Sequence, residues 1–345
     1  MKSVVCHGEK DLRVEEIDGP GPVGAGEVRI AVGAGGICGS DLHYYNHGGF
    51  GAIRIKQPMT LGHEVAGRIT ELGEGVEGLE VGNLVAISPS QPCYDCEYCD
   101  KGQHNQCLNM RYYGSAMRFP HVQGAFSEEV VANARQCHVL AEGTTAAEGA
   151  CAEPLSVGLH AINRAGNLLG KRVLVTGTGP IGALAVAAAK IHGALEVTAT
   201  DVVDEALAVA RKVGADRTIN VATNGDELAA FAENKGYFDV VIEASGNPMA
   251  IKSAADVIKP RGRLVQLGLG GEAPIPANLV AKEIEICGSF RFHEEFEWAC
   301  ELISTRRIDL EPIISHSFSF NDAVSAFESA SDRKSAMKVV LTFDK

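Results

Sequence analysis

Four of the ten cysteines stand close together in the chain, with two residues between neighbours among the first three and seven before the fourth. Four thiolates at such spacing can close a tetrahedron around one zinc ion, and a metal held by four protein ligands is structural. A ferredoxin-type iron–sulfur cluster is the main alternative, but that run has a shorter last spacing and then a proline. Here Leu108 follows, so we favour zinc over a cluster or over unligated thiols. The predicted ligands are Cys93, Cys96, Cys99 and Cys107.

A second set of potential metal ligands is dispersed along the chain, at Cys38, at the pair His63 and Glu64, and at Glu153. A catalytic zinc needs dispersed ligands, because three protein groups must surround it while a fourth position stays open for water or substrate. Each residue alone has a plain structural interpretation, as a small core residue, a hydrogen-bonded histidine or a carboxylate in the first turn of a helix. Their joint occurrence favours a catalytic zinc, and whether Glu64 or Glu153 completes it stays open.

The residues that follow Cys38 suggest a path for a proton. Zinc at this site would act as a Lewis acid on a substrate hydroxyl, whose carbon gives a hydride to a nicotinamide ring. Ser40 and then His43 would carry the released proton away, with Glu64 and Glu153 as further catalytic candidates. A local cap or loop hydrogen bond is the alternative role for Ser40 and His43. The two ligand sets together predict two zinc ions per chain, one catalytic and one structural.

A Gly-x-Gly-x-x-Gly pattern follows an apolar run at 172–176 and opens an alanine-rich stretch at 181–192. A strand before it and a helix after it form the context in which this pattern binds a dinucleotide. The glycines allow a tight turn and a close approach to the pyrophosphate, which the free N–H groups of the helix attract. A plain glycine turn is the alternative. The candidate residues are Gly177, Gly179, Pro180, Ile181 and Gly182.

Asp201 ends the next expected strand, roughly 20 residues after the last of these glycines. A carboxylate there accepts hydrogen bonds from both hydroxyls of the adenosine ribose and repels a 2′-phosphate. Neither Arg nor Lys occurs at 202–205, so we favour NAD, with NADP possible. A helix cap is the alternative role for Asp201. Further cofactor candidates, at the ends of later expected strands, are Ala244, Ser245 and Leu267.

The bulk properties narrow the class of protein. With 345 residues, the chain exceeds the size at which one hydrophobic core usually stops growing, so two domains are expected. The 31 Lys and Arg against 44 Asp and Glu give a net charge of −13, which opposes binding to nucleic acid. The sequence shows neither a signal-peptide pattern nor an apolar run long enough to span a membrane. We therefore expect no nucleic-acid or membrane partner and a location in the cytoplasm.

The residue composition and the pattern of apolar runs change near residue 153. Residues 1–152 are rich in glycine and in short β-like runs, which predicts a β-rich domain. Residues 153–287 alternate short apolar runs with alanine-rich stretches, which predicts an α/β domain with a doubly wound parallel sheet. Residues 288–345 are expected to return to the first domain. The expected parallel strands lie at 173–176, 197–200, 217–220, 239–242 and 263–267.

These motifs resemble the zinc-containing medium-chain dehydrogenase family, and the resemblance runs over essentially the whole chain. It rests on Cys38-Gly-Ser-Asp-Leu-His43, Gly62-His-Glu64, the cysteine lobe at about 90–110, Glu153-Pro-Leu and the glycine pattern. Within the family, the chain is similar to the polyol and sugar-acid branch. The resemblance implies a GroES-like catalytic domain from 1–152 and 288–345, a Rossmann domain at 153–287, and an active site in the cleft between them. It also implies a homo-oligomer, with a tetramer favoured and a dimer possible.

The same resemblance implies oxidation of a secondary hydroxyl of a small sugar-like molecule, or reduction of the matching ketone. A sugar acid needs a cation for its carboxylate and hydrogen-bond partners for its hydroxyls, and an arginine pairs with a carboxylate bidentately. We favour Arg291, which stands among apolar residues, although surface solvation is the usual fate of such side chains. A neutral polyol is the alternative substrate, and a non-catalytic nucleotide- and zinc-binding protein is the remote alternative. The substrate candidates are Tyr44, Lys56, Arg111 and Arg291.

Overall fold

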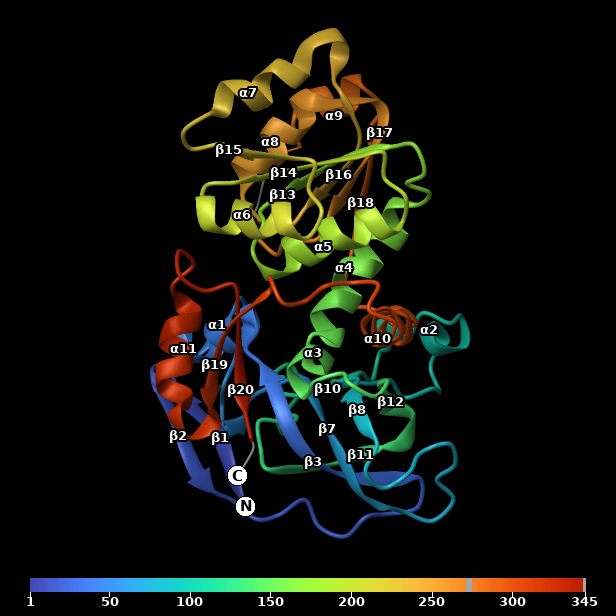
Figure 1. Cartoon of the computed structure of the whole chain (residues 1–345), viewed down its shortest axis with the longest axis vertical. Coiled ribbons are helices and arrows are strands. Elements are labelled where there is room, and N and C mark those ends of the chain that lie inside the picture. The colour runs from blue at the N-terminus through green and yellow to red at the C-terminus, as the bar shows by residue number, and fades with distance from the viewer. Residues whose placement is uncertain (271–274, 344–345) are drawn as a thin grey trace. The chain divides into compact units, whose positions relative to one another are not determined.

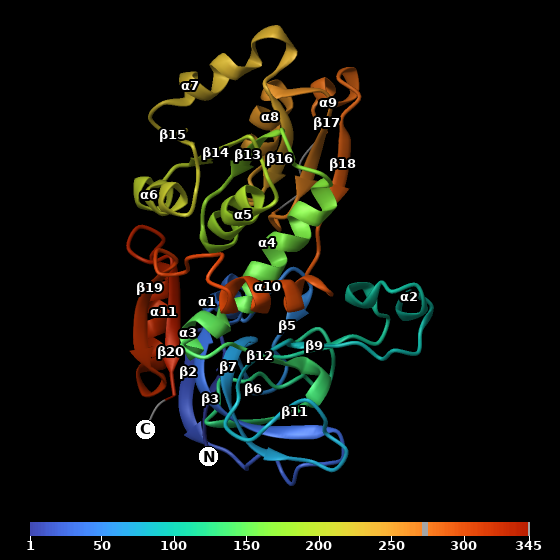
Figure 2. The same cartoon turned by 45° about the vertical axis from the view of Figure 1, so that its right-hand side comes forward.

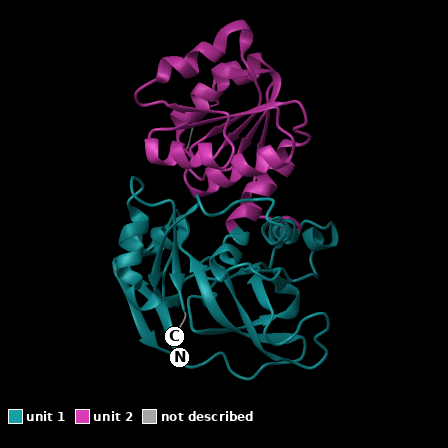
Figure 3. Cartoon of the chain, in the orientation of Figure 1, with its two compact units in different colours: residues 1–153, 296–345 teal, residues 154–295 magenta. Residues whose placement is uncertain are grey.

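The computed structural model describes residues 1–270 and 275–343 (Figure 1). The chain forms two compact units, which Figure 3 shows in different colours. Unit 1 comprises Met1–Glu153 and Phe296–Lys345, and unit 2 comprises Pro154–Glu295. Both chain ends therefore belong to unit 1. Within the described residues, no helix is both long enough and apolar enough to cross a bilayer.

Unit 1 is built mainly from antiparallel strands. The strands of its two main sheets are β1 (Lys2–Gly8), β2 (Asp11–Glu16), β3 (Glu27–Gly36), β6 (Met59–Thr60), β7 (Glu64–Leu72), β8 (Leu84–Ile87), β11 (Glu129–Asn133), β12 (Cys137–Val139), β19 (Ile314–Ser319) and β20 (Lys338–Thr342). The seven-stranded sheet has the order β12-β8-β7-β3-β20-β19, with β11 also paired to β3, and a smaller sheet has the order β2-β1-β6. Two short pairs complete the unit, β4 (Gly49–Phe50) with β5 (Ile53–Arg54) and β9 (Ser90–Gln91) with β10 (Arg111–Tyr112).

Strand β3 shows why unit 1 folds as it does. Its alternating pattern buries Val28, Ile30 and Val32 in one hydrophobic core, which also includes Phe126 and Phe327. The last strand, β20, pairs antiparallel with the end of β3. The C-terminal strand therefore lies beside the segment that leads into Cys38.

The helices of unit 1 are short. They are α1 (Gly39–His47), α2 (Glu97–Asp100), α3 (Ala146–Ala150), α10 (Glu295–Ser304) and α11 (Ala323–Ser331), with 3₁₀ turns at His104–Gln106, Ala134–Gln136 and Phe320–Asp322. Helix α1 begins with a capping box between Cys38 and Asp41 and ends at Gly48, whose φ of 62° lies in the left-handed region. Helix α4 (Ala152–Ala165) begins in unit 1 and continues in unit 2.

Unit 2 is a doubly wound sheet, which confirms the predicted α/β class. Its parallel strands are β13 (Arg172–Thr176), β14 (Glu196–Asp201), β15 (Arg217–Asn220), β16 (Phe238–Glu243), β17 (Ile258–Gln266) and β18 (Glu285–Gly288). They lie in the order β15-β14-β13-β16-β17-β18. Figures 1 and 2 show α5 (Pro180–Ile191) and α6 (Asp204–Lys212) on one face. The opposite face carries α7 (Gly225–Ala229), α8 (Pro248–Val257) and α9 (Ala277–Ala281), with a 3₁₀ turn at Ala230–Lys235.

The sequence predicted five of the six parallel strands and missed β18. This strand forms one edge of the sheet, and its residues are exposed or half-buried rather than fully buried. It therefore lacks the continuous apolar run that marks a central strand. Its neighbour β17 carries that run, with Leu264 and Val265 buried in the sheet.

Candidate active site and metal centres

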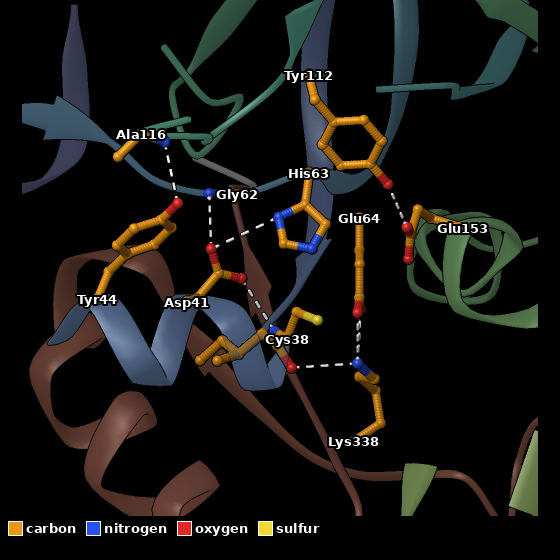
Figure 4. A network of polar contacts seen from close by, with 11 residues as sticks. Cys38, Asp41, Tyr44, Gly62, His63, Glu64, Tyr112, Ala116, Glu153 and Lys338 are labelled. Carbon is orange, nitrogen blue, oxygen red and sulfur yellow. Dashed lines mark hydrogen bonds and ion pairs between the residues drawn. The ribbon is translucent and has the colours of Figure 1, made fainter. Parts of the chain in front are cut away.

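The candidate catalytic residues come from three junctions in unit 1 (Figure 4). Cys38 lies between β3 and α1, His63 and Glu64 lie at the start of β7, and Glu153 lies in the first turn of α4. Ligand atoms of Cys38, His63 and Glu64 all lie within 4.8 Å of one another. Three residues dispersed in the sequence therefore meet at one point, and their thiol, imidazole and carboxylate suit a zinc ion.

Glycines allow the first two junctions to come so close together. Gly36 faces Glu64 across the β3–β7 pair, and a Cβ atom on Gly36 would lie 2.2 Å from Oε2 of Glu64. Gly62 has a φ of +94°, and a Cβ atom there would lie 2.1 Å from the ring of Phe126. Any larger residue at either position would push the ligand-bearing segments apart.

Asp41 links the Cys38 and His63 segments, and sequence reasoning gave it no role. Its Oδ2 accepts a hydrogen bond from the Cys38 N–H at 3.0 Å, and its Oδ1 accepts one from the Gly62 N–H at 3.3 Å. The same Oδ1 lies 3.6 Å from Nδ1 of His63, and the Asp41 side chain is completely buried. The fixed carboxylate orients the imidazole, as carboxylates commonly do behind a metal-binding histidine.

The charged groups around His63 favour a positive charge on its ring. Burial raises the pKa of Asp41 above its usual value. Burial would lower the pKa of His63, but the negative charges of Asp41 and Cys38 outweigh it and raise that pKa well above its usual value. The negative groups around His63 therefore favour positive charge at this cluster, which a bound zinc ion would supply.

Glu64 is paired with a buried lysine from the C-terminal strand. Nζ of Lys338 donates to both carboxylate oxygens of Glu64 at 2.7 Å and to the carbonyl of Ile37 at 3.1 Å. Burial would lower the pKa of Lys338, but the charge of Glu64 outweighs it and raises that pKa. A lysine at the start of a strand is usually solvated, so the sequence contains no signal for this pair.

Glu153 has a different partner. The hydroxyl of Tyr112 donates to Oε1 of Glu153 at 2.5 Å, and the Tyr112 ring centre lies 5.8 Å from that of His63. Burial raises the pKa of Glu153 to about 7. Tyr112 therefore connects Glu153 to the imidazole of the candidate zinc site. Sequence reasoning missed Tyr112, although it chose the neighbouring Arg111.

The two relay candidates lie on α1. Ser40 is in its first turn and His43 is one turn further along, with an exposed side chain. Burial of part of the ring and the positive charges of His47 and Arg333 lower the pKa of His43. His43 is therefore neutral at pH 7 and able to accept a proton.

The substrate candidates lie in both units. Tyr44 is buried, and its hydroxyl accepts a hydrogen bond from the Ala116 N–H at 3.0 Å. Lys56 and Arg111 are exposed residues of unit 1, and none of the described hydrogen bonds or ion pairs joins their charged ends to the zinc residues. Arg291 belongs to unit 2, with a φ of +55° and its guanidinium 4.9 Å from the ring centre of Phe290.

The four cysteines of the lobe also meet at one point, with sulfur atoms within 4.8 Å of one another. The Sγ of Cys107 lies 3.4 Å from that of Cys93 and 4.0 Å from that of Cys96. A zinc–sulfur bond of about 2.3 Å gives tetrahedral edges of about 3.8 Å, which these separations bracket. Hydrogen bonds from the backbone of Cys99 and Leu108 lower the pKa of Cys96, which favours its thiolate form. The lobe fits a structural zinc ion.

The glycine turn of unit 2 is closely packed. Gly177 has a φ of +79°, and a Cβ atom there would lie 2.7 Å from Ser245. A Cβ atom on Gly182 would lie 1.8 Å from the carbonyl oxygen of Gly177, so helix α5 must begin on a glycine-only turn. Pro180 occupies the first turn of this helix after Gly179. The backbone is thus shaped to approach a phosphate closely.

Asp201 ends β14 beside this turn. Its Oδ2 accepts a hydrogen bond from the Thr178 N–H at 2.6 Å, and its Oδ1 accepts one from the Val202 N–H at 2.7 Å. Asp201 therefore holds both the glycine turn and the segment before α6. Ala244 and Ser245 directly follow β16, and Leu267 directly follows β17, at the same carboxyl edge of the sheet.

The chain matches two family models. Residues 24–142 match the alcohol dehydrogenase GroES-like domain, and residues 180–305 match the zinc-binding dehydrogenase domain. The chain is 42% identical over 316 residues to L-idonate 5-dehydrogenase (NAD(P)(+)) of Escherichia coli, covering 91% of each chain. It is also 37% identical to sorbitol dehydrogenase of Gallus gallus, covering 99% of this chain and 96% of that one. The chain belongs to the zinc-binding alcohol dehydrogenase family.

Solved structures agree with this family. The crystal structure of L-idonate 5-dehydrogenase from Escherichia coli has a TM-score of 0.94 at 40% identity, covering 99% of this chain and 97% of that one. Galactitol-1-phosphate dehydrogenase from Escherichia coli has a TM-score of 0.89 at 31% identity, covering 99% and 100%. The predicted α/β class, with GroES-like and Rossmann parts, and the predicted class of zinc-dependent dehydrogenase acting on alcohols are confirmed.

Proposed function

We propose that this dehydrogenase interconverts a secondary alcohol of a sugar acid and its ketone, with L-idonate and 5-keto-D-gluconate as the pair. The observation that carries the proposal is the 42% identity, over 91% of the chain, to the L-idonate 5-dehydrogenase of Escherichia coli. The convergence of Cys38, His63 and Glu64 also supports it. Their thiol, imidazole and carboxylate groups are the ligands that a catalytic zinc ion needs for alcohol oxidation.

We assign the third protein ligand of the catalytic zinc to Glu153. Proximity alone favours Glu64, which lies in the cluster with Cys38 and His63. However, both oxygens of Glu64 accept hydrogen bonds from Lys338, whereas the described bond to Glu153 comes from a neutral phenol. An ammonium competes with a metal ion for a carboxylate far more strongly than a phenol does. Glu64 is then held in an ion pair with Lys338, and Asp41 orients His63.

A zinc ion held by Cys38, His63 and Glu153 would supply Lewis acidity, and a nicotinamide cofactor held by the glycine turn of unit 2 would supply the hydride chemistry. The chain itself must move the proton. We assign that step to Ser40 and His43, since the lowered pKa of His43 keeps its ring ready to accept a proton near pH 7. In the direction of ketone reduction the same residues return the proton.

We assign the cofactor site to unit 2, with NAD favoured and NADP possible. The glycine turn at the start of α5 fits the pyrophosphate, and the Asp201 carboxylate beside it fits the hydroxyls of the adenosine ribose. Ala244, Ser245 and Leu267 follow the strands on the other side of β13. The cofactor residues proposed are Gly177, Gly179, Pro180, Ile181, Gly182, Asp201, Ala244, Ser245 and Leu267.

The decisive experiment is a panel of substrates followed by nicotinamide absorbance. L-idonate, D-gluconate, L-galactonate, sorbitol, xylitol and galactitol are each offered with NAD and then with NADP. The proposal expects the highest kcat/KM with L-idonate and NAD. A higher kcat/KM for any neutral polyol would contradict it and favour the second candidate, a polyol dehydrogenase, which the sorbitol dehydrogenase of Gallus gallus supports at 37% identity.

We assign recognition of the carboxylate to Arg291, with Tyr44, Lys56 and Arg111 as further candidates. Replacing Arg291 with Ala should raise KM for an aldonate about tenfold or more, and KM for a neutral polyol less than twofold. Arg261→Ala is a matched control, because Arg261 is also an arginine of unit 2 with a positive φ, of 61°. Equal changes in KM for both substrates would remove Arg291 from carboxylate binding.

Two broader properties remain proposals of ours. The family resemblance implies a homo-oligomer, with a tetramer favoured and a dimer possible. A cytoplasmic location is supported by the cysteines, because all ten lie in the described residues and none of them forms a disulfide.

A further inference from the structure

Glu243 is a buried carboxylate at the carboxyl end of β16, with no exposed surface. Its Oε1 accepts hydrogen bonds from the N–H groups of Ser245 at 2.9 Å and Gly246 at 3.1 Å, from the Ser245 hydroxyl, and from the Thr176 hydroxyl at 3.3 Å. Its Oε2 accepts from the Gly246 N–H at 3.0 Å and from Nε2 of Gln266 at 2.6 Å. No ion pair of Glu243 is found in the part of the chain that the structure describes. Both carboxylate oxygens of Glu243 are therefore satisfied by hydrogen bonds.

These bonds join the ends of three neighbouring strands. Thr176 ends β13, Glu243 ends β16 and Gln266 ends β17. The backbone carbonyl of Glu243 also accepts from the N–H groups of Leu267 and Gly268 at 2.8 Å each. The segment after β17 is thus fixed both by the side chain and by the main chain of one residue.

The loops held in this way are in close contact with one another. A Cβ atom on Gly268 would lie 2.3 Å from the backbone nitrogen of Gly246, and one on Gly177 would lie 2.7 Å from Ser245. A shift of the loop after β16 would therefore move the glycine turn on one side and the β17 loop on the other. Glu243 lies at the centre of this arrangement.

The position of these loops in the sheet indicates which half of the cofactor they would contact. The strand order reverses between β13 and β16, and a dinucleotide binds across such a reversal at the carboxyl edge. Asp201 ends β14 and takes the adenosine side, so the nicotinamide side lies over β16 and β17. The loops that Glu243 holds are on the nicotinamide side.

We propose that Glu243 is a positioning residue that fixes the loops after β16 and β17 in the shape required by the nicotinamide half of the cofactor. The inference rests on the proposed function, because it presumes that unit 2 binds NAD. A glutamine cannot take over this task. A carboxylate offers about four acceptor sites and no donor, whereas an amide would turn its NH₂ group toward donors, the Gly246 N–H and Nε2 of Gln266.

Asp239 provides a matched control at the opposite end of the same strand. Its carboxylate accepts from the Arg172 N–H at 2.8 Å and from Nζ of Lys259 at 3.0 Å, and so joins β13 and β17 as Glu243 does. Asp239→Asn weakens contacts between the same three strands, but at the amino edge of the sheet. It separates a loss of sheet stability from a loss of loop position.

The test is calorimetric titration of the zinc-loaded protein with NAD⁺ and with ADP-ribose, which lacks the nicotinamide ring. Glu243→Gln should raise the Kd for NAD⁺ about tenfold or more and the Kd for ADP-ribose less than threefold. Asp239→Asn should change both values less than twofold. Gln266→Met keeps the carboxylate but removes the hydrogen bonds from Nε2 of Gln266 to Oε2 of Glu243 and to the Gly268 carbonyl. It should raise the Kd for NAD⁺ alone by about threefold, which preserves a test if Glu243→Gln does not fold.

Three results would overturn the proposal. The first is a Glu243→Gln protein that binds NAD⁺ like wild type. The second is an equal loss of affinity for NAD⁺ and ADP-ribose in the Glu243→Gln or Gln266→Met protein, which would make the network purely structural. The third is a wild-type protein that binds neither NAD⁺ nor NADP⁺. Only this third result would also overturn the proposed function, so it can be told apart from the first two.

Discussion

The two candidate metal centres of unit 1 are built in different ways. The cysteine lobe takes its ligands from one short segment, 93–107, whose regular structure is limited to α2 and a 3₁₀ turn. The catalytic candidate brings together Cys38, His63 and Glu64 from distant parts of the chain, with Glu153 as the third ligand that we propose, and buried polar residues support it. The ligands of the catalytic candidate come together only when the sheet has formed. The ligands of the cysteine lobe are already close to one another in the sequence. Substitutions at the catalytic candidate should therefore lower the rate of the reaction. Substitutions in the cysteine lobe should lower the stability of the fold.

The largest expected effect is on turnover. Cys38→Ser should lower kcat/KM about 10³-fold or more, because it removes a ligand of the zinc that supplies several kcal/mol to the reaction. The melting temperature should change little, since a serine hydroxyl can replace the thiol in the capping box that begins α1. A steady-state assay with calorimetric unfolding measures both quantities. Loss of folding equal to that of a lobe variant would break the distinction between the two centres.

The next effect concerns the pair of Lys338 and Glu64. Lys338→Met leaves the Glu64 carboxylate buried without its cation, so the free energy of unfolding should fall by about 3–5 kcal/mol. The double variant Glu64→Gln with Lys338→Met removes both charges and should recover most of this loss. Denaturant unfolding of the single and double variants completes the cycle. A single variant as stable as wild type would show that Glu64 has another cation, which would reassign it as the zinc ligand.

The smallest expected effect on chemistry belongs to the lobe. Cys96→Ser should release the structural zinc and lower Tm on the order of 5–10 °C, because the lobe has little other structure to hold it. The folded fraction should retain kcat within about threefold. Metal analysis should fall from two zinc ions per chain to one, as it should for Cys38→Ser. A thousandfold loss of kcat in the folded Cys96→Ser protein would refute the structural role.

The sequence predicted what depends on local spacing. Short sequence patterns were enough to predict three features: the four-cysteine lobe, the glycine turn at Gly177 and the start of α5. The meeting of Cys38 with His63 required the family resemblance as well, because nothing local indicates that β3 pairs with β7.

The supporting residues could not be predicted in the same way. Lys338 reaches Glu64 only because β20 pairs with β3, and that pairing joins residues at opposite ends of the chain. Glu243 looks like an ordinary residue at the end of a strand, and its role appears only when the ends of β13, β16 and β17 are seen together. Asp41 alone carried a local signal, since its place three residues after Cys38 is that of a capping box.

The most direct test of the account is anomalous diffraction at the zinc absorption edge from crystals of the purified enzyme. We expect two zinc peaks per chain, one among the four lobe cysteines and one bound by Cys38, His63 and Glu153. A zinc peak in the lobe with none beside Cys38 would contradict the proposed site of catalysis.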